Sequence, residues 1–208
     1  MAIADGMSIS CSDLQSVGGT RLIAMRVVSS LDVVAYDNAT HGINSIVNSG
    51  GVATEAGWGV YESRIESSNF TITGSNEGKD TTTYECSLSW FIPGMTASQF
   101  LRLYQFDGDC LMVMVIDNND NSAGTTAAAA TYASNKVFGV SEKYENADLP
   151  SRNQTYARLV SVEGGTGGAF SDEIGVTVTV AATQYEIPRK YEGTIILGAT
   201  GKTLTTEA

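Results

Sequence analysis

The residues of this sequence that could do chemistry are few and lie far apart. The chain has one histidine, His41, in a turn beside Gly42. A serine activated by a histidine would have to use His41, and no G-x-S-x-G motif presents such a serine. We interpret His41 as an exposed turn residue without a catalytic role.

A stretch rich in asparagine resembles the start of a calcium-binding loop. Asp117, Asn119 and Asn121 have the spacing of the first three ligands of such a loop. Ser122 stands where the loop needs glycine, and Ala128 stands where it needs a bidentate glutamate. The sequence therefore predicts no calcium site here.

Two further patterns also lack the features of an active site. Glu85, Asp172 and Glu173 are among many acidic residues that could form the carboxylate pair of a glycoside hydrolase, but nothing selects two of them. The glycine-rich segment 164–168 lacks the Gly-Lys-Ser/Thr of a P-loop and the spacing of a dinucleotide-binding motif. We expect no enzyme activity and no catalytic, cofactor-binding or metal-binding residues.

Composition and charge limit the possible partners. The 208 residues include 12 basic and 23 acidic side chains, which gives a net charge of −11. Tight binding to a phosphate backbone depends on clustered lysine and arginine, so a nucleic-acid-binding role is not expected. The length and the hydrophobic content of 42% are those of one globular domain.

The cysteines and the N-terminus indicate the compartment. Cys86 and Cys110 lie in apolar strand patterns, and with Cys11 they make an odd number without zinc-ligand spacing. We therefore expect buried free thiols in a reducing cytoplasm. The first ten residues lack the features of a signal peptide, and no apolar stretch approaches the ~18 residues of a membrane span.

The elements that would position any functional residue centre on a strand, a helix and a second strand. Residues 81–93 alternate between apolar and polar side chains, which is typical of a half-buried strand. Thr96 and Gln99 have capping-box spacing and open a predicted helix over about 96–107, which ends at Gly108. We expect its apolar residues to cover one face. Residues 110–116 form a continuous apolar run, which predicts a strand buried on both sides. The residues expected on that face are Phe100, Leu101, Leu103 and Tyr104.

The remaining pattern predicts a mainly β protein. Short strands are expected at 21–28, 31–36, 42–47, 58–65, 68–73, 136–140, 156–162, 175–181 and 191–197. Together they predict a single antiparallel β-sandwich or barrel over 1–208, with one short α-helix and long loops. Residues 118–135 are interpreted as a loop inserted into a hairpin, and residues 198–208 as a polar tail. The inserted loop is either an ordinary surface loop or one that packs on a neighbouring subunit.

The order of these elements resembles that of tail-tube-like structural proteins of bacteriophages. The resemblance lies in TTTYECSLSWFIPGMT with its preceding strand, in the helix, in the LMVMVIDNND…KVFGVSEKY hairpin and in GGTGGAFSDEIGVTVTV. Gly18-Gly19, which lead into a strand, also match. The resemblance is one of element order, and it spans most of residues 11–195. Residues 121–135 depart from it, because the hairpin turn in the family is usually tight.

The resemblance implies a virion structural protein that is made in the host bacterial cytoplasm and located in the tail. Members of the family form six-membered rings that stack into a hollow tube through which the genome passes. An acidic lumen would repel DNA phosphates and so would not retain the passing duplex. The implied partners are further copies of the chain and other tail proteins. Segments 42–57 and 118–135 and both termini are candidates for contacts between rings.

Two alternatives stay open. One is another virion part, such as a head decoration or head-to-tail connector protein. The other is a carbohydrate-binding β-sandwich or a carbohydrate-active enzyme, which would need Trp58, Tyr61 and Trp90 to form an exposed platform. Trp90 shares the apolar register of Leu88 and Ile92, which favours its burial.

Overall fold

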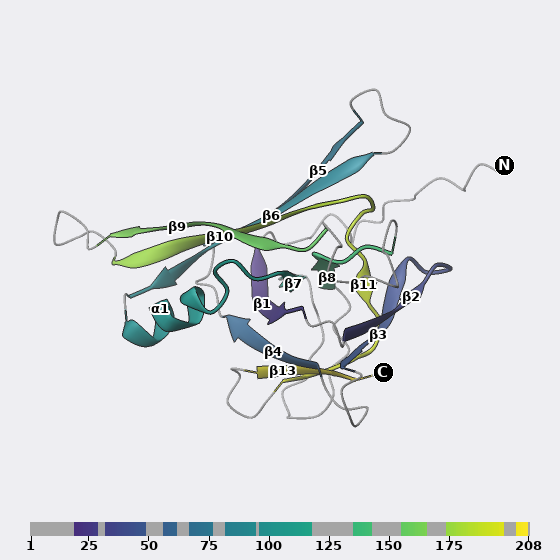
Figure 1. The fold of residues 1–208 in the computed structure, drawn as a ribbon, viewed down its shortest axis with the longest axis horizontal. Coiled ribbons are helices and arrows are strands. Elements are labelled where there is room, and N and C mark those ends of the chain that lie inside the picture. Colours follow the sequence, from purple (N-terminus) through teal and green to yellow (C-terminus); the bar gives the residue numbers. More distant parts are fainter. Residues whose placement is uncertain are drawn as a thin grey trace, which may run out of the picture.

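The described part of the chain forms three β-sheets, with one helix at the side of one of them (Figure 1). Our computed structural model confirms the predicted mainly β, antiparallel, sandwich-like architecture. It describes residues 19–28, 32–48, 56–61, 67–76, 82–94, 96–117, 135–142, 155–165, 174–197 and 203–207.

The largest sheet runs through the middle of the molecule and has six strands. All its strand pairs are antiparallel. In spatial order the strands are β12 (Thr194–Leu197), β13 (Thr203–Glu207), β4 (Ala56–Tyr61), β1 (Thr20–Val27), β7 (Leu111–Asp117) and β8 (Asn135–Phe138).

Two smaller sheets lie on either side of it. The four-stranded sheet is antiparallel throughout and has the order β5 (Ser68–Ser75), β6 (Thr83–Pro93), β10 (Gly175–Gln184) and β9 (Arg158–Gly165). The three-stranded sheet has the order β11 (Lys190–Tyr191), β3 (Gly42–Asn48) and β2 (Asp32–Asp37), and its β11–β3 pair is parallel. The helix, α1, spans Ala97–Tyr104.

Strand β7 separates two hydrophobic cores, because its side chains alternate between them. Met112, Met114 and Ile116 contribute to the core on the side of the three-stranded sheet. Leu111 and Val113 contribute to the core on the side of the four-stranded sheet. All residues from 111 to 116 are buried, so the predicted strand with two buried faces is confirmed.

The helix begins where the sequence predicts and ends three residues before the predicted end at 107. The backbone N–H of Phe100 donates to the carbonyl of Thr96 at 3.2 Å, which fixes the first turn. Gly108 has φ +79°, a left-handed conformation that suits glycine and ends the segment. Only Leu103 is buried, whereas Phe100, Leu101 and Tyr104 are exposed. Of the four apolar residues expected to cover one face, one is therefore buried and three are exposed.

Two segments expected to be loop or tail contain strands, and a third, the contact segment 42–57, begins with the strand expected at 42–47. Asn135, placed at the end of the inserted loop, begins β8 and pairs with Ile116. Thr203–Glu207, placed in the polar tail, forms β13 between β12 and β4. Of the contact segment 42–57, residues Gly42–Asn48 form β3. The rest of the inserted loop, residues 118–134, lies outside the described residues.

Candidate assembly surface and polar cluster

The four-stranded sheet has an apolar face and a polar face, and whole rows of side chains follow this division. Its apolar face packs on the six-stranded sheet, as expected for an antiparallel sheet with one face on the core. One row across that face consists of Phe70, Leu88, Val180 and Leu159. The next row, on the opposite face, consists of Asn69, Ser89, Thr179 and Ser161. The outer face is therefore lined mainly with hydroxyl groups.

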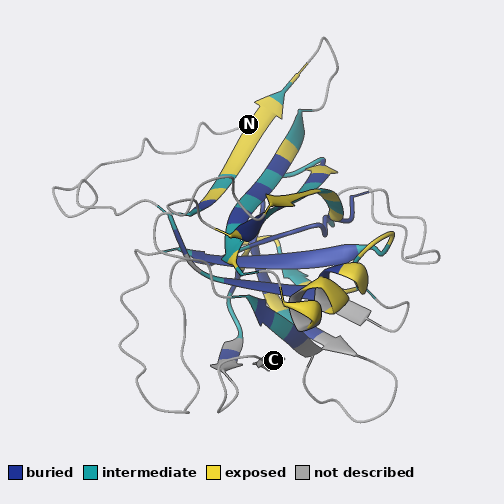
Figure 2. Ribbon diagram, turned by 90° about the vertical axis from the view of Figure 1, so that its left-hand side faces the viewer, coloured by how far each residue is buried: buried dark blue, intermediate teal, exposed yellow. Residues whose placement is uncertain are grey.

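The two ends of this sheet, β5 and β9, each have a strand neighbour on one side only within the described part of the chain. A strand at a sheet edge presents unpaired N–H and C=O groups to any other strand that approaches. Natural edge strands are commonly protected by short length, charged side chains or proline. β5 has eight residues without a charge or a proline. Figure 2 shows that exposed residues predominate along it.

Strand β9 carries a bulge that changes its outer side. Thr179 pairs with Ser161 and Val180 pairs with Leu159, so Val160 is an extra residue in β9. The side chain of Val160 is 64% exposed. Val162, on the apolar face, is 42% exposed because no described strand covers it beyond β9. The edge at β9 is thus open and partly apolar.

A second concentration of functional groups surrounds Arg189, which is 5% exposed. Its Nη2 donates to Glu142 Oε2 at 2.7 Å and to Glu186 Oε2 at 2.8 Å. The same atom donates to Asn38 Oδ1 at 3.2 Å, and the guanidinium carbon lies 4.9 Å from the centroid of the Tyr36 ring. This polar cluster ties together segments that lie more than 140 residues apart in the sequence.

The single positive charge of Arg189 is shared between two carboxylates in the polar cluster. Burial alone would raise the pKa of Glu186, but the hydrogen bonds from Arg189 and from the backbone N–H of Glu142, together with the Arg189 charge, outweigh it. The pKa therefore lies below its ordinary value. Burial alone would lower the pKa of Arg189, and its two carboxylate partners raise it overall. Such a pair is suited to holding loops together, because both groups keep their charge and their partners.

The structure describes the histidine and two of the three cysteines that the sequence analysis considered. His41 is exposed, and its Nε2 lies 3.0 Å from the carbonyl oxygen of Ile187, to which it can donate. Cys86 is a fully buried free thiol, and burial, with a smaller contribution from Glu85, raises its pKa to about 12. Cys110 is a half-buried free thiol. Cys11 and the candidate carboxylates Asp172 and Glu173 lie outside the described residues.

The aromatic residues considered for carbohydrate binding do not form an exposed platform. Trp58 and Trp90 are 1% and 0% exposed and belong to different cores. Tyr61 is half-buried and makes edge contacts with Trp90 and Phe106, with ring centroids 6.2 and 5.8 Å apart. The prediction that Trp90 is buried is confirmed. The carbohydrate alternative therefore loses its proposed platform.

Comparisons with known proteins give no functional assignment, so a functional argument has to start from the fold and from these surfaces. No family model, curated protein or solved structure matches the chain. Among the described residues, no helix is long and apolar enough to span a membrane, and no cluster of histidine, cysteine or acidic side chains has the arrangement of a metal site.

Proposed function

We propose that the chain is a structural protein of a tailed-bacteriophage virion that self-assembles into six-membered rings, which stack to form the tail tube. The observation that carries the proposal is the four-stranded antiparallel sheet, whose two end strands are both open in the described part of the chain. A subunit with two different open edges can join copies of itself by heterologous contacts, which generate rings when the rotation closes.

The number of strands supports the same conclusion. Because adjacent strands in this sheet are antiparallel and there are four of them, β5 and β9 run in opposite directions. Rotation about an axis along the strands then places β9 of one copy antiparallel to β5 of the next. The sheets of neighbouring copies can thus continue as one antiparallel sheet around a central channel.

The outer face of the sheet also suits a channel for DNA. Its middle strands present Ser87, Ser89, Thr177 and Thr179. Among the described residues on this face, the acidic Glu85 and Glu163 outnumber the one basic residue, Arg158. The net charge of the chain is −11. Negative charge repels phosphate groups, and the absence of clustered basic residues removes the main source of affinity for DNA. A duplex would pass such a surface without being retained.

Negative-stain electron microscopy of the purified protein at several concentrations, combined with sedimentation velocity, tests the proposal. We expect rings with a central hole, or tubes with a regular axial repeat. A protein of 21.9 kDa that stays monomeric at every concentration contradicts self-assembly. Closed shells or single rings that never stack would instead favour a decoration or connector protein.

A further inference from the structure

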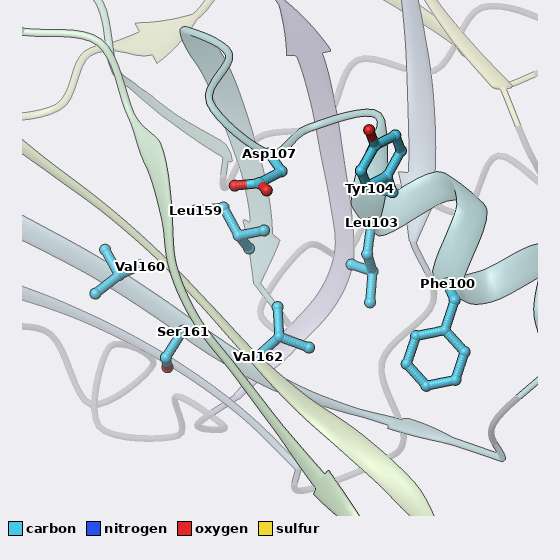
Figure 3. Close-up of a pocket in the computed structure, with 8 residues that line it drawn as sticks. All are labelled: Phe100, Leu103, Tyr104, Asp107, Leu159, Val160, Ser161 and Val162. Atoms are coloured by element: carbon cyan, nitrogen blue, oxygen red, sulfur yellow. The ribbon is translucent and has the colours of Figure 1, made fainter.

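A shallow apolar groove separates α1 from β9. It has a volume of about 330 Å³ and is bordered by Phe100, Leu103, Tyr104 and Asp107 on and after the helix and by residues 159–162 of β9, so its lining is mainly apolar with one carboxylate at its end. Figure 3 shows Leu103 and Val162 directed into the space between the helix and the strand. The groove therefore runs beside the open edge of the four-stranded sheet.

The apolar side chains around this groove are more exposed than folding of a single copy requires. Tyr104 is 75% exposed and Phe100 is 40% exposed on the helix. On the strand, Val160 is 64% exposed and Val162 is 42% exposed. A contiguous exposed apolar patch beside a strand edge is typical of a binding surface. A strand edge next to an apolar groove is suited to β-augmentation, in which an added strand gains backbone hydrogen bonds and side-chain pockets.

Charge limits where a second copy of this chain can make contact. Two copies with a net charge of −11 repel each other, so contact is favoured where charge is absent or balanced. β5 carries no charge, and the two charges of β9, on Arg158 and Glu163, cancel. Both edge strands therefore meet the electrostatic requirement for contact between copies.

The side-chain pattern of β5 also matches the groove. Ile72 lies on the core-facing side of β5, opposite the buried Cys86, yet it is 39% exposed because β5 ends the sheet. Val162 lies on the corresponding face of β9, opposite Val178. Adding β5 of one copy to β9 of another would place Ile72 beside Val162 and the helix, while the polar faces of the two sheets would join.

We propose that the edge of β9 and the groove beside α1 receive strand β5 of a second copy of this chain, with Ile72 in the groove. This inference rests on the proposed self-assembly and specifies its contact. Two variants block the contact from opposite sides: Val160→Lys combined with Tyr104→Lys on the groove, and Ile72→Lys on β5. Ile187→Lys is a matched control, because Ile187 is 50% exposed and lies beside the three-stranded sheet near His41.

Sedimentation velocity of the separate and mixed variants tests the proposal, with circular dichroism as a check of folding. We expect the wild type and Ile187→Lys to assemble, and the groove and β5 variants each to remain monomeric. An equimolar mixture of these two variants should give a dimer and nothing larger, because each variant supplies the one surface that the other has lost. Monomers in the mixture would overturn the proposal.

The other outcomes separate the possible failures. If Ile72→Lys assembles like the wild type while the groove variant does not, the occupant is not β5, and symmetric pairing of two β9 strands is favoured. If all variants assemble like the wild type, the contact is wrong but self-assembly stands. If the wild type itself never assembles, both proposals fail.

Cross-linking gives a second measurement that does not depend on a lysine variant folding. Thr71→Cys or Thr73→Cys chains are mixed with Ser161→Cys or Glu163→Cys chains, in a background with serine at Cys11 and Cys110. These four positions lie on the polar face of the two edge strands. We expect a disulfide-linked dimer in at least one mixture after oxidation, and none with Ile187→Cys as the partner. If none of the four mixtures forms a cross-link, the proposal is overturned.

Discussion

The two sides of the molecule differ in whether their polar and apolar groups have partners within one copy of the chain. On the side of the three-stranded sheet, the Nη atoms of Arg189 donate to carboxylates and backbone carbonyls of the same chain. The side chain of Asn135 exchanges two hydrogen bonds with the backbone of Tyr191 at 2.6 and 2.9 Å. On the side of the four-stranded sheet, both edge strands are open in the described part of the chain, and α1 exposes three large apolar side chains.

This difference indicates that the side of the three-stranded sheet contributes mainly to the stability of one copy, and the side of the four-stranded sheet mainly to assembly. Polar groups that are buried and paired contribute to folding of one copy, because removing one partner leaves the other unsatisfied. Exposed apolar groups and open edges contribute little to a single copy and gain their stabilisation only when another strand covers them. Substitutions on the first side should therefore lower stability, and those on the second side should affect assembly.

Arg189→Met should have the largest effect on stability. It leaves Glu142 and Glu186 without their cation, and removing one partner of a buried ion pair costs about 3–5 kcal/mol. Urea denaturation followed by circular dichroism measures the change. Lys136→Met is the matched control, since Lys136 pairs with Asp117 at 3.4 Å with its side chain 42% exposed. We expect the control to cost no more than about 1 kcal/mol. Equal losses in the two variants would contradict the special role of the polar cluster.

A matched pair of isoleucine substitutions should have the next largest effect. Ile46 on β3 is 0% exposed, and Ile72 on β5 is 39% exposed. Ile46→Ala should lower the free energy of unfolding by about 2–5 kcal/mol, because it removes buried contacts and leaves a cavity. Ile72→Ala should lower that of the monomer by less than about 1 kcal/mol. Thermal unfolding at low protein concentration compares them, and a large loss for Ile72→Ala would show that β5 is part of the monomer core.

The smallest effect is a pH dependence on the side of the polar cluster. The pKa of Glu186 lies below its ordinary value of 4.5 in the folded protein, so its ionised form is stabilised there. This contribution is present above pH 4.5 and is lost as the pH falls from there through the folded pKa. The stability difference between the wild type and Glu186→Gln should therefore shrink when urea titrations are moved from pH 7 to pH 3.5. In an Arg189→Met background the difference should vary less with pH.

Much of the fold could be predicted because its main strands follow local patterns. The alternation at 81–93 placed Cys86, Leu88 and Trp90 in the core, and the apolar run at 110–116 predicted a strand buried on both faces. The strand expected at 68–73 corresponds to β5, which pairs antiparallel with β6. These features depend on residues close together in sequence, which periodicity can detect.

The surfaces that matter for function could not be predicted in the same way. Phe100, Leu101 and Tyr104 have the spacing of core residues, and only the position of α1 beside β9 leaves them exposed. Arg189 binds partners that precede it by as many as 152 residues, and no local motif marks them. Asn135 follows a polar stretch and resembles the loop residues before it, although it is 3% exposed and begins a strand.

The position of β13 constrains when the chain can fold during its synthesis. β4 pairs with β1 on one side and with β13 on the other, where Ala56 is opposite Thr206. The six-stranded sheet therefore cannot be completed until a ribosome has released residues far beyond the first two thirds of the chain. Contacts of such long sequence separation form slowly, and exposed strand edges favour aggregation in the meantime. Truncation before residue 203 would leave β4 without this neighbour, so expression of the shortened chain should yield mainly insoluble material.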